Sequence, residues 1–362
     1  MKKKILVLEP YFGGSHRQFL EGLAKNVEAD FYWLTLPARK WKMRMQLSAY
    51  WFYGEIEKNR EEFKNSDVIL CSTFVDVAVL RSLLSRIAWW DNGTRILTYF
   101  HENQFAYPNQ IADSSIHQFT AINFGSAVAS DKIGFNSRFN RDSFLDGCRK
   151  YLKKAADMNL VKVVENLEEK SSVLYPGIDF TAIDKKDRKH NNSLPVIIWN
   201  HRWEHDKGPE SFFAALYNLK ERGVQFKLIV LGESFRYQPA CFKEAEERLA
   251  DELIHFGYAD SFEEYIVLLT QGDIVVSTSL HEFYGISVIE AVRAGNYPVL
   301  PERLSYPELF DDQFLYGEGQ LEDVLQRILK SRKLFDGEKV CKMTDQFSWD
   351  AMKSKYENWL FG

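Results

Sequence analysis

The sequence has few cysteines and no long apolar run, and these absences exclude several classes of protein. Its four cysteines, among 362 residues, are far apart and form no Cys-x-x-Cys pair, so neither a disulfide framework nor a zinc site is indicated. No stretch approaches the roughly 20 apolar residues that span a membrane. We therefore expect a cytoplasmic protein that makes no stable association with a membrane.

Metal and dinucleotide motifs are also absent. The chain contains neither a His-Glu-x-x-His pair nor an Asp-x-Asp motif, and it has no Gly-x-Gly-x-x-Gly fingerprint. We expect no metal requirement and no cofactor. The net charge of −5 argues against a protein that is covered in nucleic acid, but it leaves room for a local basic face.

Short apolar runs alternate with helical patterns along the chain, which is typical of doubly wound parallel sheets. The runs fall in two sets, residues 5–8, 31–34, 68–71 and 95–99, then 196–200, 227–231, 274–276 and 297–300. The first run, after Met1-Lys2-Lys3-Lys4, is too short for a signal-peptide core. We expect an α/β protein with an N-terminal domain at 1–183, a polar linker at 184–194 and a C-terminal domain at 195–345. A last helix in 346–362 is expected to pack back on the first domain.

The segment from His281 to Glu290 follows the apolar run at 273–277 and contains two glutamates around a glycine turn. A strand that feeds a helix through such a turn points several backbone N–H groups and the positive end of the helix at one place, which suits a phosphate. We expect the backbone of Phe283, Tyr284, Gly285 and Ile286 to bind it. Glu282 then lies at the turn and Glu290 inside the helix.

Two cations lie just after another predicted strand. Arg202 and Lys207 follow the run at 196–200, and open α/β sheets bind their ligands at the carboxyl ends of strands. A planar guanidinium and a mobile ammonium suit a diphosphate leaving group that gains negative charge as its bond breaks. These residues are candidate catalytic groups.

The ordered motifs of the chain resemble those of the GT-B retaining glycosyltransferases of family 4. They are Arg202-x4-Lys207-Gly208, the pair Glu282 and Glu290, Tyr175-Pro176-Gly177-Ile178-Asp179 and Phe256-Gly257-Tyr258. The resemblance implies two Rossmann-like domains that face each other across a cleft. It also implies that Glu282 binds the transferred sugar, Glu290 the ribose and the backbone at Tyr258 the nucleobase. Phe283-Tyr284 and His201 depart from the usual residues of the family.

The N-terminal half resembles a narrower group that includes the tRNA-queuosine mannosyltransferases. The motifs that carry this likeness are Glu9-Pro10-Tyr11-Phe12-Gly13-Gly14-Ser15-His16, Leu36-Pro37-Ala38-Arg39-Lys40-Trp41 and the segment from Tyr99 to Pro108. The resemblance implies transfer of mannose from GDP-mannose to the cyclopentene diol of queuosine in tRNA. A sugar nucleotide and a tRNA are thus the expected partners.

Several residues of the first half are candidate site residues. Gly13 and Gly14 allow close approach to the donor, and Ser15 is expected to cap the next helix. His101 follows a strand, where the family has a histidine near the donor sugar. The candidates for acceptor binding are His16, Arg39, Lys40, Trp41, Glu102, Asn103 and Gln104.

Three alternatives stay open at this point. The segment from Trp41 to Tyr53 can be interpreted as an amphipathic basic helix, which favours a family 4 enzyme with another sugar nucleotide and a lipid-linked, polysaccharide or small-molecule acceptor. A second alternative is a binding module with an inactive site, against which the complete set of Arg202, Lys207, Glu282 and Glu290 argues. The basic helical run at 149–154 is either a solvated face or part of a tRNA surface.

Overall fold

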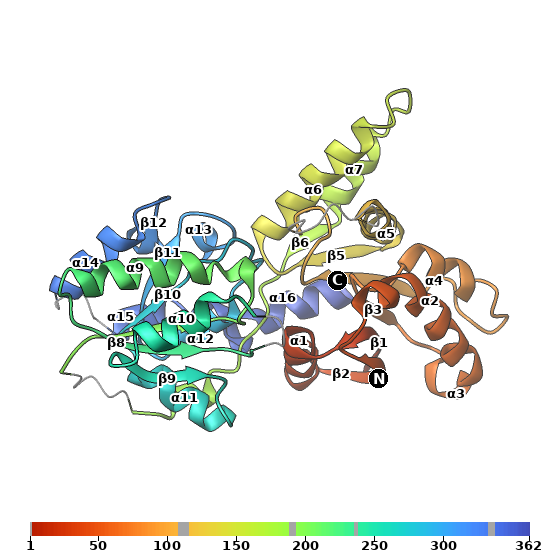
Figure 1. The fold of residues 1–362 in the computed structure, drawn as a ribbon. Coiled ribbons are helices and arrows are strands. Elements are labelled where there is room, and N and C mark those ends of the chain that lie inside the picture. The colour runs from red at the N-terminus through yellow and green to blue at the C-terminus, as the bar shows by residue number, and fades with distance from the viewer. Residues whose placement is uncertain (1, 108–115, 188–192, 235–237, 332–336) are drawn as a thin grey trace. The chain divides into compact units, whose positions relative to one another are not determined.

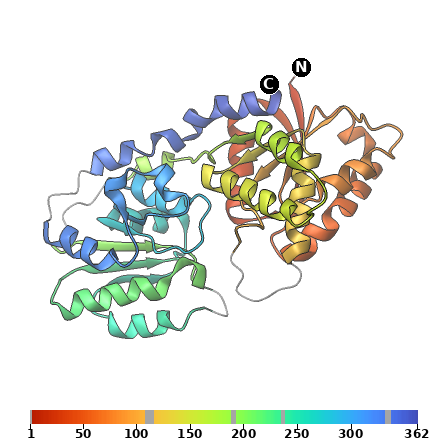
Figure 2. The same cartoon turned by 90° about the horizontal axis from the view of Figure 1, so that it is seen from above.

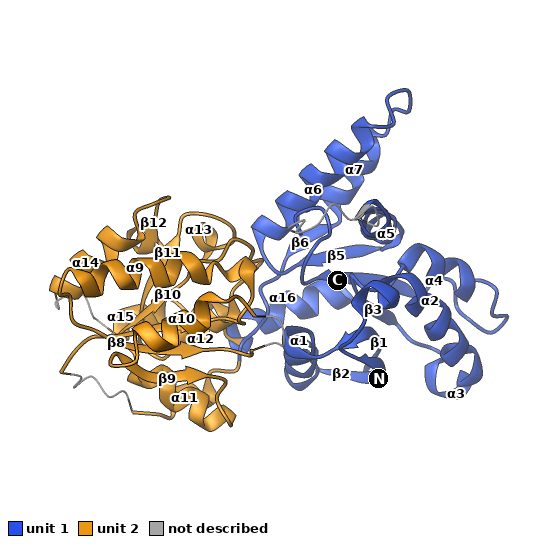
Figure 3. Cartoon of the chain, viewed as in Figure 1, with its two compact units in different colours: residues 1–178, 349–362 blue, residues 179–348 orange. Residues whose placement is uncertain are grey.

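The computed structural model describes residues 2–107, 116–187, 193–234, 238–331 and 337–362. The chain divides into two compact units, residues 1–178 with 349–362 and residues 179–348 (Figure 3). Residues 179–183, which the sequence assigns to the first domain, thus belong to the second unit. The reason is local, since Arg293 binds both oxygens of Asp184 at 2.6 and 2.7 Å and lies 4.8 Å from the Phe180 ring. Part of the expected linker, residues 188–192, lies outside the described residues.

The first unit is built on a parallel sheet of six strands in the order β2-β1-β3-β4-β5-β6 (Figure 1). The central strands are almost fully buried runs of aliphatic residues, as expected for a parallel sheet with both faces covered. The strands are β1 (Lys3–Phe12), β2 (Ala29–Pro37), β3 (Val68–Ser72), β4 (Arg95–Phe100), β5 (Lys132–Phe135) and β6 (Ser171–Val173).

Helices cover both faces of this sheet. One core joins the sheet to α1 (Gly14–Asn26) and to the last helix, α16 (Trp349–Phe361), which runs along this unit in Figure 2. The opposite core joins the sheet to α2 (Trp41–Lys58) and α4 (Val77–Leu84). The remaining helices are α3 (Arg60–Phe63), α5 (Ile116–Ala129), α6 (Arg138–Lys153) and α7 (Val161–Glu169).

The last helix belongs to the core of the first unit although it follows the second unit in the sequence. Tyr356 donates to the carbonyl oxygens of Leu174 and Tyr175 at 3.2 and 3.0 Å, and Lys132 donates to that of Trp359 at 2.9 Å. The bonds tie the end of the chain to strand β5 and to the segment after β6.

The second unit repeats the architecture with a parallel sheet in the order β12-β11-β10-β7-β8-β9. Its strands are β7 (Val196–Asn200), β8 (Lys227–Leu231), β9 (Leu253–Gly257), β10 (Ile274–Val276), β11 (Tyr297–Pro301) and β12 (Leu315–Tyr316). One core joins the sheet to α9 (Pro209–Glu221), α10 (Cys241–Arg248) and α14 (Leu321–Ser331). The other helices are α8 (Thr181–Asp184), α11 (Phe262–Gln271), α12 (Ile286–Arg293), α13 (Tyr306–Leu309) and α15 (Gly337–Lys342), with 3-10 turns η1 (His205–Lys207), η2 (Asp312–Phe314) and η3 (Asp345–Phe347).

The predicted fold class is confirmed, and each of the eight predicted apolar runs lies in a strand. The short strands β5, β6 and β12 were not predicted, because they have two to four residues and include Lys132, Ser171 and Ser172. Such segments carry no periodic signal of their own. None of the described helices combines the length and the apolar character that crossing a membrane would need.

Candidate active site

The turn between β10 and α12 has the geometry that the sequence predicts for a phosphate site. Gly285 is the N-cap of α12 with φ 93°, and a Cβ there would lie 3.3 Å from the Tyr306 ring, so a larger residue is strained at this position. In the first turn of α12, the amides of Ile286 and Ser287 have no partner within the helix. These amides and the positive end of the helix can bind an anion.

Lys207 joins the two motifs of the second unit. Its ammonium donates to the His281 carbonyl at 2.7 Å and lies 3.3 Å from a carboxylate oxygen of Glu282. Asp206 is also 3.3 Å away, and the Lys207 side chain is only 8% exposed. The close approach depends on Gly208, where φ is 61° and a Cβ would lie 2.5 Å from the Thr278 carbonyl oxygen.

Glu282 is held as a carboxylate by its neighbours. Burial alone would raise its pKa, but the charge of Lys207 and the hydrogen bonds that the carboxylate accepts together outweigh burial and lower the pKa to about 2. Its Oε1 accepts from the backbone of Phe283 at 3.1 Å and of Tyr284 at 3.4 Å. Two of the amides expected to hold phosphate therefore bind Glu282 in this structure, because its side chain turns back over its own loop.

Glu290 lies one turn further along α12 and is largely buried. Its Oε2 accepts from the Tyr265 hydroxyl at 2.7 Å, and Asn200 donates to that hydroxyl at 2.8 Å.

Tyr258 and Arg202, the other two predicted site residues of this unit, lie at the surface. Tyr258 is 70% exposed directly after β9, and the Arg202 guanidinium pairs with Glu204 at 3.0 Å.

His201, the departure from the family pattern, is buried beside Lys207. Neither of its ring nitrogens has a hydrogen-bond partner among the described residues. Burial, with Lys207 nearby, lowers the pKa of His201 to about 3. The imidazole is therefore neutral and packs against the Trp199 ring, with centroids 5.0 Å apart.

In the first unit, His16 lies between two carboxylates. Its Nδ1 is 3.0 Å from Glu9 Oε2 and its Nε2 is 3.4 Å from Glu102 Oε2. Carboxylates only accept hydrogen bonds, so an imidazole that donates to both must be protonated. Burial lowers the pKa of His16, but the two carboxylates outweigh it and raise the pKa to about 10.

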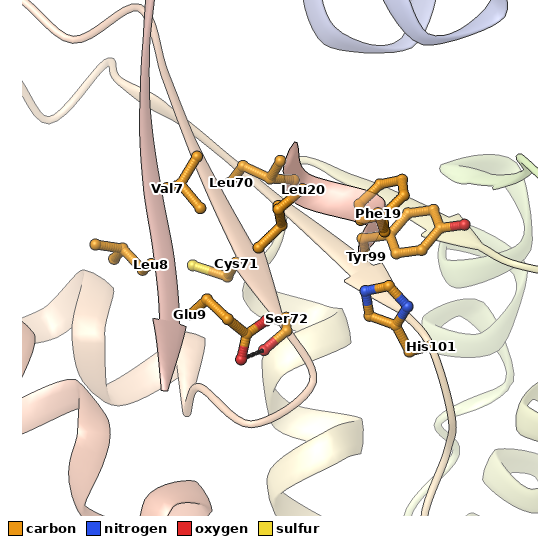
Figure 4. A pocket seen from close by; sticks show the side chains of 10 residues that line it. All are labelled: Val7, Leu8, Glu9, Phe19, Leu20, Leu70, Cys71, Ser72, Tyr99 and His101. Carbon is orange, nitrogen blue, oxygen red and sulfur yellow. Dashed lines mark hydrogen bonds between the residues drawn. The ribbon is translucent and has the colours of Figure 1, made fainter. Parts of the chain in front are cut away.

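His101 packs directly on this charged ring. The two imidazoles stack with centroids 4.0 Å apart, and the rings of Phe19 and Tyr99 contact His101 edge-on with centroids 5.0 and 4.8 Å away. Burial and the charge of His16 hold the pKa of His101 well below its usual value. His101 also lines a small pocket together with Glu9, Ser72 and Cys71 (Figure 4). This pocket has room for about one water molecule.

A chain of aromatic contacts connects the histidines to the start of α2. Phe74 stacks on His16 with centroids 5.4 Å apart and contacts Trp41 at 6.2 Å. Arg39 and Lys40, exposed, directly precede Trp41, and Lys40 has a left-handed backbone with φ 53°. Three sequence motifs, separated by up to 85 residues from His16 to His101, thus meet in one region of the first unit.

Besides His16, two of the residues that we expect to bind the acceptor are buried in this structure. Asn103 is buried, and its amide nitrogen donates to Asn140 Oδ1 at 2.8 Å and to Ser143 Oγ at 3.0 Å. Its oxygen accepts from Phe105 and Ala106, so Asn103 orders the turn after His101. Gln104 is also buried.

The glycine turn after β1 also differs in detail from the prediction. Helix α1 begins at Gly14, with Gly13 as its N-cap and without a side-chain cap, so Ser15 lies inside the helix and does not cap it. A Cβ on Gly13 would lie 2.6 Å from that of Ala38, the residue before Arg39. Gly13 therefore lets the two loops approach each other closely.

Sequence reasoning assigned no role to Glu9 and did not identify Thr73 or Tyr265. Glu9 is 1% exposed and accepts from Ser72 Oγ at 3.1 Å and from the Tyr11 amide at 2.7 Å. A carboxylate at the end of an apolar run is the signal that could have identified it, because buried acids are rarely unpaired. Thr73 and Tyr265 hold Glu102 and Glu290, and no local pattern marks them.

Known families match both halves of the chain. Residues 4–178 match the family described as tRNA-queuosine alpha-mannosyltransferase N-terminal, and residues 180–336 match glycosyl transferases group 1. The chain is 34% identical over 364 residues to the tRNA-queuosine alpha-mannosyltransferase of Drosophila melanogaster, which covers 98% of this chain and 94% of that protein. It is also 29% identical over 108 residues, 30% of this chain and 28% of the relative, to a GDP-mannose:cellobiosyl-diphosphopolyprenol alpha-mannosyltransferase of Xanthomonas oryzae.

Solved structures share the fold at low identity. The HepE protein of Anabaena in complex with UDP superposes with a TM-score of 0.69 at 13% identity, over 99% of both chains. Sucrose-phosphate synthase of Thermosynechococcus elongatus also gives 0.69, at 14% identity, over 99% of this chain and 98% of that one. The fold is thus that of the GT-B glycosyltransferases. The identity of 34% over 98% of the chain shows which family of this fold includes the chain. The chain belongs to the tRNA-queuosine alpha-mannosyltransferase family.

Proposed function

We propose that this protein transfers mannose from GDP-mannose to a hydroxyl of the queuosine cyclopentene diol in tRNA, with retention at the anomeric carbon. The observation that carries the proposal is the identity of 34% across 98% of the chain to an enzyme named for this reaction. The proposed acceptor is a tRNA, and we therefore propose a cytoplasmic protein.

The donor binds to the second unit in this proposal. The ammonium of Lys207 and the first-turn amides of α12 neutralise the diphosphate as the bond between C1 and the phosphate oxygen breaks. Arg202, more exposed, reaches the same charge from the loop after β7. Glu282 accepts hydrogen bonds from hydroxyls of the mannosyl group, and Glu290 accepts hydrogen bonds from hydroxyls of the ribose. The backbone at Tyr258 contacts the base. GDP-mannose as the donor is supported by the similarity to the Xanthomonas relative, which is named as a GDP-mannose-dependent mannosyltransferase.

The acceptor hydroxyl attacks C1 on the face from which the diphosphate leaves. The new bond joins the acceptor oxygen to C1, the bond to the phosphate oxygen breaks, and the departing phosphate oxygen takes the proton of the hydroxyl. Neutral His101 can hydrogen-bond the sugar, whereas the charge of His16 is already shared by two carboxylates. No step requires a metal, since the cations of the protein and the helix end oppose the developing charge.

Acceptor binding is assigned to the first unit. Arg39 and Lys40 contact phosphates of the RNA, and Trp41 stacks on an unpaired base. Glu102 completes this region because its carboxylate is partly exposed beside His16, with a side-chain exposure of 17%.

To test the proposal, the purified protein is incubated with radiolabelled GDP-mannose and with bulk tRNA that carries or lacks queuosine. A gel then separates the RNA from free sugar. We expect label only on the tRNA that contains queuosine. Matched controls are the wild type and a Lys207→Met variant, which we expect to bind the same tRNA without labelling it. Equal labelling of both tRNA pools would contradict the proposed acceptor.

A second acceptor class is favoured by one observation. The exposed face of α2 carries Met43, Leu47, Tyr50 and Trp51, with exposures of 49, 51, 53 and 38%. Such a stripe beside basic residues also suits a membrane surface and a lipid-linked acceptor. Flotation with anionic vesicles distinguishes the two, since a tRNA enzyme stays with the soluble fraction and keeps its tRNA labelling.

A further inference from the structure

The helical hairpin of α6 and α7 extends from the first unit beyond the part that it packs on (Figure 1). Its base is anchored in a hydrophobic core through Phe144, Leu145 and Cys148 of α6 and Val164 and Leu167 of α7. Residues 149–163 contribute no buried side chain, and Met158 and Val161 are 60 and 63% exposed. We call residues 150–162 the arm. The arm contributes no buried side chain to a hydrophobic core, so core packing does not account for its presence.

The arm is basic in an acidic protein. It contains Lys150, Lys153, Lys154 and Lys162 but a single acid, Asp157, whereas the whole chain carries a net charge of −5. All four lysines are exposed, and none forms an ion pair within the part of the chain that the structure describes. Arg149, just below the arm, differs because Asp146 and Glu168 neutralise it at 2.8 and 3.0 Å. Unneutralised cations at the end of a hairpin suit a polyanion.

The base of the arm is tied to the turn that carries His101. Asn136, just before α6, donates to the His101 carbonyl at 2.7 Å, and Asn140 donates to the Phe100 carbonyl at 2.9 Å. Asn103 closes the connection with its bond of 2.8 Å to Asn140. At about 1.5 Å per residue, α6 reaches about 20 Å from Asn140 to Lys153. The lysines therefore lie at a fixed distance from the candidate acceptor region of the same unit.

We propose that the arm binds the phosphate backbone of the acceptor tRNA in the stem that adjoins the modified loop. The proposal rests on the proposed function, because a loop nucleotide beside His101 brings the adjoining stem within reach of α6. Double-stranded RNA is recognised mainly through its backbone and shape, for which lysines without bidentate geometry are sufficient. The arm therefore adds affinity for any tRNA stem and leaves the choice of the nucleotide to the loop contacts.

The test compares three RNAs that contain queuosine: the complete tRNA, its anticodon stem-loop and an oligonucleotide of the loop alone. The variant is Lys153→Glu/Lys154→Glu. The matched control is Lys353→Glu/Lys355→Glu, which makes the same charge change on exposed positions of α16 in the same unit. Neither pair touches a core, so both variants should keep the melting temperature of the wild type.

For the arm variant we expect KM for the tRNA and for the stem-loop to rise about tenfold or more, and the dependence of log KM on log salt to become shallower by about one to two. KM for the loop oligonucleotide, KM for GDP-mannose and kcat at saturating RNA stay unchanged. Equal KM values for the arm and control variants on the tRNA would overturn the proposal while the transfer itself stands. A loss of binding to anionic vesicles with unchanged tRNA kinetics would make the arm a membrane contact and would also overturn it. If the wild type labels none of the three RNAs, the proposed function fails, and the arm proposal fails with it.

Discussion

His16 and His101 stack with their ring centroids 4.0 Å apart, and only His16 is charged. Glu9 and Glu102 each face one ring nitrogen of His16, which stabilises the imidazolium against the effect of burial. Burial and the charge of His16 act together to keep His101 neutral, and the neutral ring has both a donor and an acceptor nitrogen.

Replacement of His16 by Gln should change the pH dependence of the enzyme. A Gln amide donates from only one end, so it cannot satisfy both carboxylates. Without the neighbouring cation, the pKa of His101 rises toward its usual value, and the acidic limb of kcat/KM moves to higher pH. We expect kcat to fall about tenfold to a hundredfold. The measurements are pH–rate profiles and side-chain ¹⁵N spectra of the histidines.

The matched control for this experiment is His117→Gln, at an exposed position of α5. It should keep the profile of the wild type. If His16→Gln shifts neither the profile nor the His101 resonances, His16 does not control His101.

The stability of the first unit should depend on pH through the same residue. The pKa of His16 is about 6.5 in an unfolded chain and about 10 in the folded protein, so its stabilisation is complete below pH 6.5 and is lost as the pH rises through 10. The difference in free energy of unfolding between the wild type and His16→Gln should shrink by up to about 1.4 kcal/mol per pH unit in this range. Urea unfolding at several pH values measures it. A difference that is constant with pH would contradict a charged His16.

The contributions of Lys207 and Glu282 to stability should be separable from their contributions to turnover. Lys207→Met leaves the Glu282 carboxylate largely buried without its cation and should destabilise the protein by about 3 kcal/mol. The double variant Lys207→Met/Glu282→Gln removes both charges and should recover most of that loss. Turnover should remain at least about a hundredfold below that of the wild type in both variants, because the leaving diphosphate is no longer opposed by a cation.

Denaturant unfolding and single-turnover labelling distinguish the two contributions. Arg202→Gln provides the comparison, since its half-exposed side chain should affect turnover with little effect on stability. Wild-type turnover in the double variant would remove Lys207 from the mechanism.

Replacement of Lys40 should increase the stability of the protein and weaken its binding of RNA. Its left-handed backbone, with φ 53°, is unfavourable for any residue with a Cβ. Lys40→Gly relieves this strain and should raise the free energy of unfolding by up to about 1 kcal/mol. The same variant loses a cation beside Trp41, so KM for tRNA should rise. Lys40→Asn, which tolerates the left-handed region, should weaken tRNA binding as much with a smaller gain in stability. An unchanged KM in both variants would exclude Lys40 from the RNA surface.

Chelation should leave the reaction intact. In the proposed mechanism Lys207, Arg202 and the first turn of α12 oppose the charge of the leaving diphosphate, so EDTA should not reduce the initial rate of labelling. Among the described residues no group of three His, Cys, Asp or Glu side chains is arranged as a metal site. A rate that falls with EDTA and recovers with Mg²⁺ or Mn²⁺ would contradict this mechanism.

The sequence by itself determined the fold class, the order of the motifs and most of the strands. Central parallel strands are covered on both faces, so each is a continuous aliphatic run such as Val196–Asn200, which can be recognised without knowledge of its neighbours. The glycine turn at Gly285, the position of Lys207 in the loop after a strand and that of Glu290 inside a helix are equally local properties.

Only the tertiary structure decided which side chains meet and what state they are in. The contact of His16 with Glu9, Glu102 and His101 depends on β1 lying beside β3 and β3 beside β4, an order that follows from packing and not from local sequence. The polar segment after β4 illustrates the limit, because Asn103 is used inside the turn while Glu102 stays partly exposed. The charge of His16 and the neutrality of His101 have the same origin, since a pKa is set by burial and by the charges within a few ångströms, and the chain brings those charges together only when it folds.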